Sequence, residues 1–139
     1  MNFHEKYYMK GGNIMLLTPG PINKDYTDGE LTNWHLEALN NSENTVNIYF
    51  SLYALSPMQQ PIPLGTTSTT LEPGVYTFLN LLVLPLSEHT IPVIEIPSDE
   101  ILVTLYGRND SFQEITGAIF NRSNLIQLSK PLLPVGTEV

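Results

Sequence analysis

The stretch Thr45–Leu55, TVNIYFSLYAL, decides the fold of this chain. Its apolar side chains alternate with polar and tyrosine side chains at a period of two, which places the two sets on opposite faces of an extended strand. β-branched and aromatic residues suit such a half-buried pleated surface. The stretch therefore predicts a core strand of an all-β domain, with Tyr49 and Tyr53 on its polar face.

Runs of the same kind flank this strand, and turn-forming residues separate them. About eight short strands at roughly regular spacing, with no convincing helix between them, are typical of a β-sandwich of the jelly-roll or immunoglobulin-like kind. A short buried helix over 78–84 is the one alternative, because periodicity does not exclude it. The other strands are expected over 30–39, 66–71, 75–84, 93–96, 100–107, 114–120 and 125–128.

The 139 residues are enough for one domain with its own core. We expect the sandwich over 30–128, a leader and extended N-terminal arm over 1–29, and a loose C-terminal tail over 129–139. Lys10-Gly-Gly, ahead of Met15, can be encoded by a purine-rich bacterial ribosome-binding sequence. Residues 1–14 are therefore interpreted either as a misread start or as a genuine flexible arm.

Composition limits the partners of the chain. The formal net charge is −8 with only six Lys and Arg, so phosphate backbones are repelled and nucleic-acid binding is disfavoured. No apolar run approaches the roughly 20 residues that cross a bilayer, so we expect no membrane span. The chain has no cysteine, which excludes disulfides, thiolate metal sites and cysteine nucleophiles.

No catalytic, cofactor-binding or metal-binding motif stands out, and we predict that the protein is not an enzyme. His35 and Glu37 share a strand face, but two residues do not make a metal site. Asp25, Asp28 and Glu30 resemble a sparse calcium loop without the spacing of an EF-hand. Solvated side chains explain both sets better than ligation does.

Two predicted strands, 75–84 and 100–107, are apolar on both faces. A strand that is wet on one side does not need this, so either the same chain covers both faces or another copy covers one of them. The apolar start of the arm can also add as a strand to a neighbouring copy. The assembly interface predicted in this way consists of Met15, Leu16, Leu17, Tyr76, Phe78, Leu82, Leu102 and Tyr106.

Three stretches carry a resemblance to a known group of proteins: WHLEALNNSENTVNIYFSLYAL, TTLEPGVYTF and ILVTLYGRNDSFQEITGAIF. Over residues 30–128 the chain resembles small β-sandwich proteins of spore-forming bacteria, such as subunits of endospore appendage fibres. The resemblance implies a jelly-roll fold, an N-terminal connector and a place on the cell or spore surface. The appendage subunits cross-link their fibres through connector cysteines, which this chain lacks.

The sequence thus leads to two hypotheses about function. In the first, the protein is a structural subunit that assembles with copies of itself, head to tail by addition of the N-terminal arm, into a fibre or surface layer. In the second, it is a non-catalytic carbohydrate- or surface-binding module whose ligand face holds Tyr49 and Tyr53. Packing or interface roles for these two tyrosines are the alternative to ligand binding.

Overall fold

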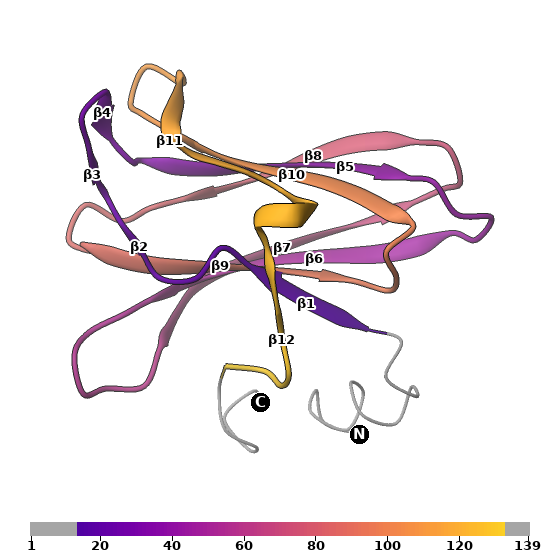
Figure 1. Ribbon diagram of the computed structural model, residues 1–139, viewed down its shortest axis with the longest axis horizontal. Helices are drawn as coiled ribbons and strands as arrows, with labels where there is room; N and C mark the ends of the chain where they lie inside the picture. The colour runs from indigo at the N-terminus through magenta and orange to yellow at the C-terminus, as the bar shows by residue number, and fades with distance from the viewer. Residues whose placement is uncertain (1–13, 133–139) are drawn as a thin grey trace.

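A computed structural model describes residues 14–132 of the chain. Two antiparallel sheets pack face to face, as Figure 1 shows, with a small two-stranded ribbon at one end. The predicted all-β sandwich is therefore confirmed. The predictions for residues 1–13 and 133–139, including the misread start, lie outside the described residues.

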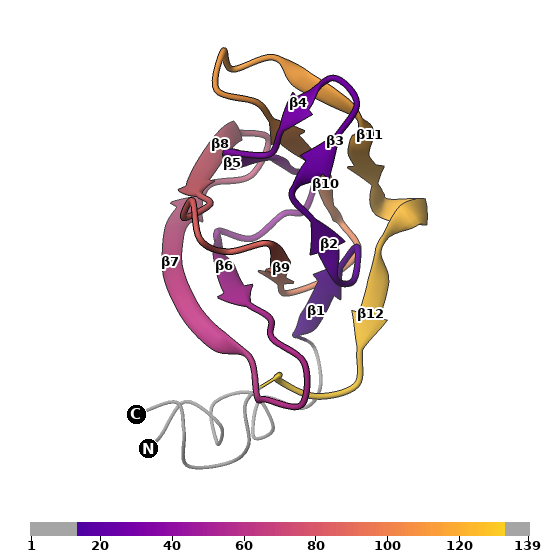
Figure 2. The same cartoon turned by 90° about the vertical axis from the view of Figure 1, so that its left-hand side faces the viewer.

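The first sheet has the strand order β12-β1-β9-β6-β7, and β2 also pairs with β9. Figure 2, which looks along the sandwich, shows β7 and β12 on opposite sides of the molecule. These two strands form the edges of the sheet. Its strands are β1 (Met15–Thr18), β2 (Ile22–Asn23), β6 (Val46–Ala54), β7 (Ile62–Leu71), β9 (His89–Ile96) and β12 (Ile126–Leu128).

The second sheet has the order β11-β10-β5-β8. A 3-10 turn, η1 (Arg122–Asn124), leads from β11 back to the first sheet, and β3 (Asp25–Tyr26) with β4 (Gly29–Glu30) forms the ribbon. The strands of the second sheet are β5 (Asn33–Asn40), β8 (Tyr76–Leu82), β10 (Ile101–Arg108) and β11 (Glu114–Asn121).

The wiring between the sheets is that of a jelly roll. Only the β6–β7 and β10–β11 connections are hairpins between long strands of one sheet. The β5–β6, β7–β8, β8–β9 and β9–β10 connections each cross from one sheet to the other. As a result, β5 pairs with β8 and β6 pairs with β9, although neither pair is consecutive in the chain. Of the two predicted sandwich types, this Greek-key arrangement matches the jelly roll.

The core lies between the inner faces of the two sheets. The strand that the sequence places at the centre, β6, turns Ile48, Phe50 and Leu52 inward. Trp34 lies opposite on β5 and is fully buried, as an inward tryptophan is expected to be. The other large residues that are fully buried are Leu17, Leu31, Leu36, Ile94, Ile96, Ile101, Leu105 and Ile115.

The structure corrects several predicted boundaries. The sandwich begins at β1 rather than at residue 30, because Met15–Thr18 is paired on both sides, with β9 and with β12. The part of the predicted arm from Met15 to Thr18 is therefore a strand of the sheet. The helix alternative for 78–84 is wrong, since β8 is a strand. The predicted loose tail is wrong for its first residues, because Leu132 packs against Leu16 and Val93.

Candidate functional site

The outer face of the β11-β10-β5-β8 sheet carries most of the exposed apolar side chains of its strands. Strand pairing brings them into register: Tyr76 lies beside Leu39 and Leu39 beside Leu102, while Tyr106 lies beside Ile119. We call this surface the apolar face. It consists of Leu39, Tyr76, Phe78, Leu82, Leu102, Tyr106 and Ile119.

Exposure on the apolar face is high for residues of regular strands. The exposed fractions of Tyr76, Phe78, Leu82 and Leu102 lie between 51% and 73%. Tyr106 and Leu39 are half-buried. A shallow depression of about 170 Å³ lies between Leu39, Tyr76 and Leu102. Within residues 14–132 no segment covers this surface, so the second apolar face that the sequence predicts for 75–84 and 100–107 is open to solvent.

His35 lies in the middle of the apolar face and is 4% exposed. Its Nδ1 is 2.7 Å from Asn80 Oδ1, and its Nε2 is 3.3 Å from Glu37 Oε2. The imidazole ring lies between the rings of Phe78 and Tyr106, with centroid distances of 5.1 and 6.1 Å. The predicted proximity of His35 and Glu37 is thus a hydrogen bond inside an aromatic cluster.

The tyrosines of the apolar face are neutral at physiological pH. Burial raises the pKa of Tyr76 and of Tyr106, and the nearby Glu37 raises both further. The charge of Arg108 acts on the same two hydroxyls in the opposite direction. The charge of Glu114, which lies opposite Arg108, also raises the pKa of Tyr106. The face therefore carries two acidic side chains, Glu37 and Glu114, and the basic Arg108 among apolar and neutral groups.

The predicted interface residues fall into two groups. Tyr76, Phe78, Leu82, Leu102 and Tyr106 all lie on the apolar face. Met15, Leu16 and Leu17 do not, because β1 is an internal strand of the other sheet. Leu17 is fully buried in the core, and Leu16 packs against Val93. Both edges of β1 are paired within the chain, so the assembly role of these three residues stays a prediction to which the described structure adds no open strand edge.

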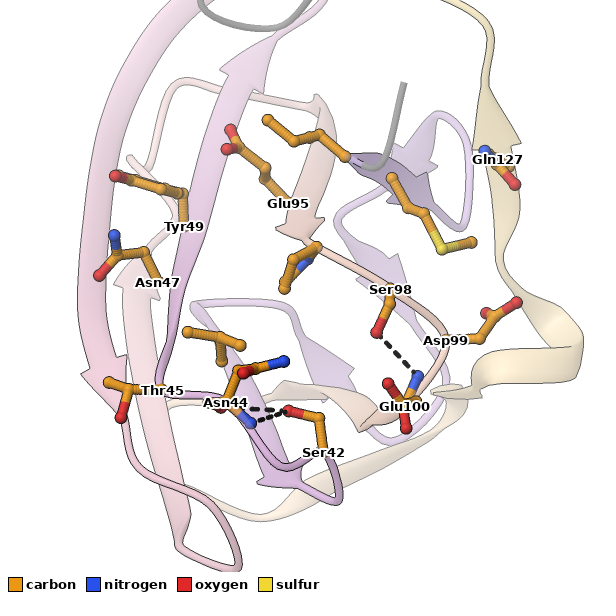
Figure 3. A pocket seen from close by; sticks show the side chains of 14 residues that line it. Ser42, Asn44, Thr45, Asn47, Tyr49, Glu95, Ser98, Asp99, Glu100 and Gln127 are labelled. Atoms are coloured by element: carbon orange, nitrogen blue, oxygen red, sulfur yellow. Dashed lines mark hydrogen bonds between the residues drawn. The ribbon is translucent and has the colours of Figure 1, made fainter. Parts of the chain in front are cut away.

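A groove of about 720 Å³ lies at one end of the first sheet (Figure 3). Its walls come from the outer faces of β6 and β9, from the loops after β5 and β9, and from β1 and β12. Glu95 is 6% exposed and lies opposite Tyr49 in the pairing of β9 with β6. The lining residues are Ile14, Met15, Ser42, Asn44, Thr45, Val46, Asn47, Tyr49, Glu95, Pro97, Ser98, Asp99, Glu100 and Gln127.

The two tyrosines of the predicted ligand face occupy different surroundings. Tyr49 lines the groove, whereas Tyr53 packs against Leu16 and Val93. Burial raises the pKa of Tyr53, a hydrogen bond with Ser51 partly opposes this, and the charge of Glu95 adds to it. Both tyrosines lie on the outer face of β6, but only Tyr49 lines the groove.

The sparse acidic segment of the β3–β4 ribbon does not converge on a single point. The Asp28 carboxylate accepts a hydrogen bond from the Thr116 backbone N–H at 2.9 Å. Glu30 pairs instead with Lys24 at 3.4 Å. Over the described residues, no group of three or more His, Asp or Glu side chains is arranged to hold a metal ion.

Sequence reasoning missed the groove because its lining comes from segments that are far apart along the chain. Ser42–Asn47, Glu95–Glu100 and Gln127 contain no motif, and only the folded wiring brings them together. The alternation in β6 identified Tyr49 alone. It gave no signal for Glu95, which lies in the strand expected over 93–96.

The described part of the chain holds no helix of the length and hydrophobicity that a bilayer crossing requires. Comparisons with protein-family models, with characterised proteins and with solved structures find no match to this chain. The fold thus defines the class, an all-β jelly-roll sandwich, and any functional conclusion has to come from its surfaces.

Proposed function

We propose that this protein is a non-catalytic structural module that associates with copies of itself through the apolar face. The observation that carries the proposal is the exposure of four large side chains, Tyr76, Phe78, Leu82 and Leu102, on one regular sheet surface. Soluble monomers rarely present a contiguous apolar surface of this kind, and such surfaces mark interaction sites.

Charge favours a second copy as the occupant. The chain has a net charge of −8, so two copies repel each other over most of their surface. The apolar face carries few charges, since Glu37, Glu114 and Arg108 leave it a small net negative charge. In a two-fold pair the same surface of each copy forms the interface, so residues of the apolar face on one copy contact residues of the apolar face on the other. Glu37 of one copy can then approach Arg108 of its partner.

The area of the apolar face sets the expected affinity of the dimer. The seven residues 33–39 of β5 pair along the sheet. With a rise of about 3.3 Å per residue along the strands and a spacing of about 4.8 Å between strands, the face is roughly 23 Å long and 20 Å wide. This is about half of the ~800 Å² that each partner contributes to a standard interface. The pair is therefore expected to be reversible and to depend on protein concentration.

Assembly beyond the pair forms the finer part of the proposal. A two-fold contact closes on itself, so a fibre or surface layer of the kind that endospore appendage subunits form needs a second contact. Strand addition by β1 is not the candidate for this contact, because Met15–Thr18 is already paired on both sides. The ten-residue strand β7 is the longest edge that the described chain leaves open on one side.

The test is a concentration series by analytical ultracentrifugation on the wild type and two lysine variants. We expect a reversible dimer for the wild type. Leu102→Lys should weaken it about tenfold or more, because a buried unpaired charge is costly. Leu86→Lys is the matched control, since Leu86 is 95% exposed in the loop between β8 and β9, away from the apolar face.

A wild type that remains monomeric up to about 1 mM would contradict the proposal, because such an affinity amounts to only about 4 kcal/mol. Equal weakening by both lysine variants would also contradict it, because the effect would then come from charge in general. Thermal unfolding of each variant shows whether the sandwich is intact.

A further inference from the structure

We infer that the groove at the end of the first sheet binds a neutral carbohydrate chain. This function is separate from self-association. Its volume of about 720 Å³ falls inside the range of roughly 300–1,000 Å³ that is usual for ligand clefts. It is also larger than the depression on the apolar face, which has a volume of about 170 Å³.

The lining has the hydrogen-bonding chemistry that sugar hydroxyls require. Hydroxyl and amide side chains donate and accept at the same time, as each sugar hydroxyl does. Carboxylates add strong acceptors. The hydroxyl and amide groups of the groove are Ser42, Asn44, Thr45, Asn47, Ser98 and Gln127.

Charge excludes an anionic ligand. Among residues 14–132, those that line the groove include no Lys, Arg or His, whereas Glu95, Asp99 and Glu100 are acidic. A phosphate or sulfate group would meet repulsion there and no cation to pair with. Nucleotides, phosphopeptides and sulfated glycans are therefore poor ligands for this site.

A cationic peptide fits less well than a neutral glycan, because the acidic groups are partly compensated or buried. Asp99 Oδ1 accepts from Arg122 Nε at 3.0 Å, so its charge is paired. Glu95 lies at the buried end of the groove and is 6% exposed. Glu100 is thus the exposed acidic side chain of the groove for which the described residues supply no side-chain partner. Six neutral polar side chains line the groove beside it.

Tyr49 supplies the apolar surface that a sugar ring needs. Figure 3 shows its side chain projecting from β6 next to that of Asn47, with Glu95 on the adjacent strand. The tyrosine ring is half-buried, which leaves one part packed and another part facing the groove. An aromatic ring with a polar tip offers stacking and a hydrogen bond to the same ligand.

The loops of the groove are held in place before any ligand arrives. Asn40 Oδ1 accepts from the Ser42 backbone N–H at 2.9 Å, and Ser42 Oγ accepts from the Asn44 backbone N–H at 3.3 Å. On the opposite wall, Ser98 Oγ accepts from the Glu100 N–H at 3.2 Å. Preorganisation of this kind lowers the entropy that binding costs.

The experiment is a glycan array followed by isothermal titration calorimetry on the full chain. The probes are neutral cello-, manno- and chito-oligosaccharides, with a heparin hexasaccharide and a lysine-rich peptide for comparison. We expect that at least one neutral oligosaccharide is retained and that neither charged probe binds. Tyr49→Ala should weaken binding about tenfold, and Tyr49→Phe should retain most of it because the ring is kept.

Tyr76→Ala is the matched control, because it removes a tyrosine from the opposite sheet. It should leave sugar binding unchanged and weaken the dimer, while Tyr49→Ala does the reverse. Retention of no neutral oligosaccharide, binding of heparin or the peptide alone, or equal binding by Tyr49→Ala would each overturn the inference. None of these outcomes bears on the apolar face, which shares no residue with the groove.

Discussion

Asn40 is fully buried at the end of β5, where its side chain joins three segments of the chain. Its Nδ2 donates to the carbonyl oxygens of Asn44 at 2.8 Å and Leu71 at 2.9 Å. Its Oδ1 accepts from the backbone N–H and the hydroxyl of Ser42. One amide thus fixes the β5–β6 turn to the end of β7 and shapes one wall of the groove.

Replacing Asn40 by Ala is expected to lower the free energy of unfolding by about 2–3 kcal/mol, because buried backbone groups lose their partners. Urea unfolding followed by circular dichroism measures the change. Asn41→Ala is the control, since Asn41 is the exposed neighbour. A loss below about 0.5 kcal/mol for Asn40→Ala would mean that water replaces the amide without cost.

The environment of Asp28 leads us to expect that the stability of the protein depends on pH in the acidic range. The hydrogen bond from the Thr116 N–H lowers the pKa of its carboxyl group in the folded state. A depressed folded pKa contributes stability above the unfolded value of about 3.9, and this stability is lost as the pH falls through the folded value. Asp28→Asn should therefore lose less stability than the wild type when the pH falls from about 5 to below 3.

Thermal unfolding at a series of pH values tests this expectation, with Asp25→Asn as the control from the same ribbon. If Asp28→Asn and the wild type lose stability in parallel on acidification, the Thr116 hydrogen bond does not act on the unfolding equilibrium.

At the scale of elements, β1 is the segment whose role changed most between sequence and structure. Leu17 is fully buried in the sandwich core, and its strand is hydrogen-bonded on both sides. Leu17→Asp should abolish cooperative unfolding or cost more than about 4 kcal/mol, because an unpaired carboxylate would enter the core. Differential scanning calorimetry measures this effect.

Ile126→Asp is the matched substitution on the neighbouring strand β12, where the side chain is 60% exposed. It should change the stability by about 0.5 kcal/mol or less. A folded Leu17→Asp protein that has lost only its self-association would instead support a free arm that adds to a neighbour.

Strands with strict alternation were predictable, and strands with prolines were not. The prediction for 45–55 agrees with β6, and those for 100–107 and 114–120 agree with β10 and β11 within a residue. In contrast, β9 begins at His89 although Pro92 lies inside it. Proline normally interrupts a central strand because it lacks an N–H donor.

The pairing of β9 explains why Pro92 is tolerated. On this edge β1 pairs with Glu95 and its neighbours and β2 pairs with Thr90, so Pro92 faces the bend between the two strands. There, the Thr18 hydroxyl donates to the Pro92 carbonyl at 2.6 Å. No backbone donor is needed at this point. Pro92 is therefore accommodated by a contact between residues 74 positions apart, and local sequence patterns do not show such a contact.

At the scale of the whole molecule, the sequence showed that more apolar surface is present than one sheet interface can hide. It did not show which strand the chain would cover. The outer side of β9 is shielded within the chain by Leu16, Tyr53, Leu128 and Leu132. The outer sides of β8 and β10 stay open. Which strand receives cover depends on the path of the chain after β12, which brings Leu132 to this side, and this is a property of topology.

The placement of the groove and the apolar face on opposite sheets has a consequence for avidity. A pair of molecules joined back to back would display two grooves, one from each copy. On a repeating polymer, the second groove would bind at the effective concentration set by the first, which can strengthen retention by a factor of about 10² to 10⁴ without any new contact. Weak binding by each groove would then be enough for one dimer to hold two polymer chains together.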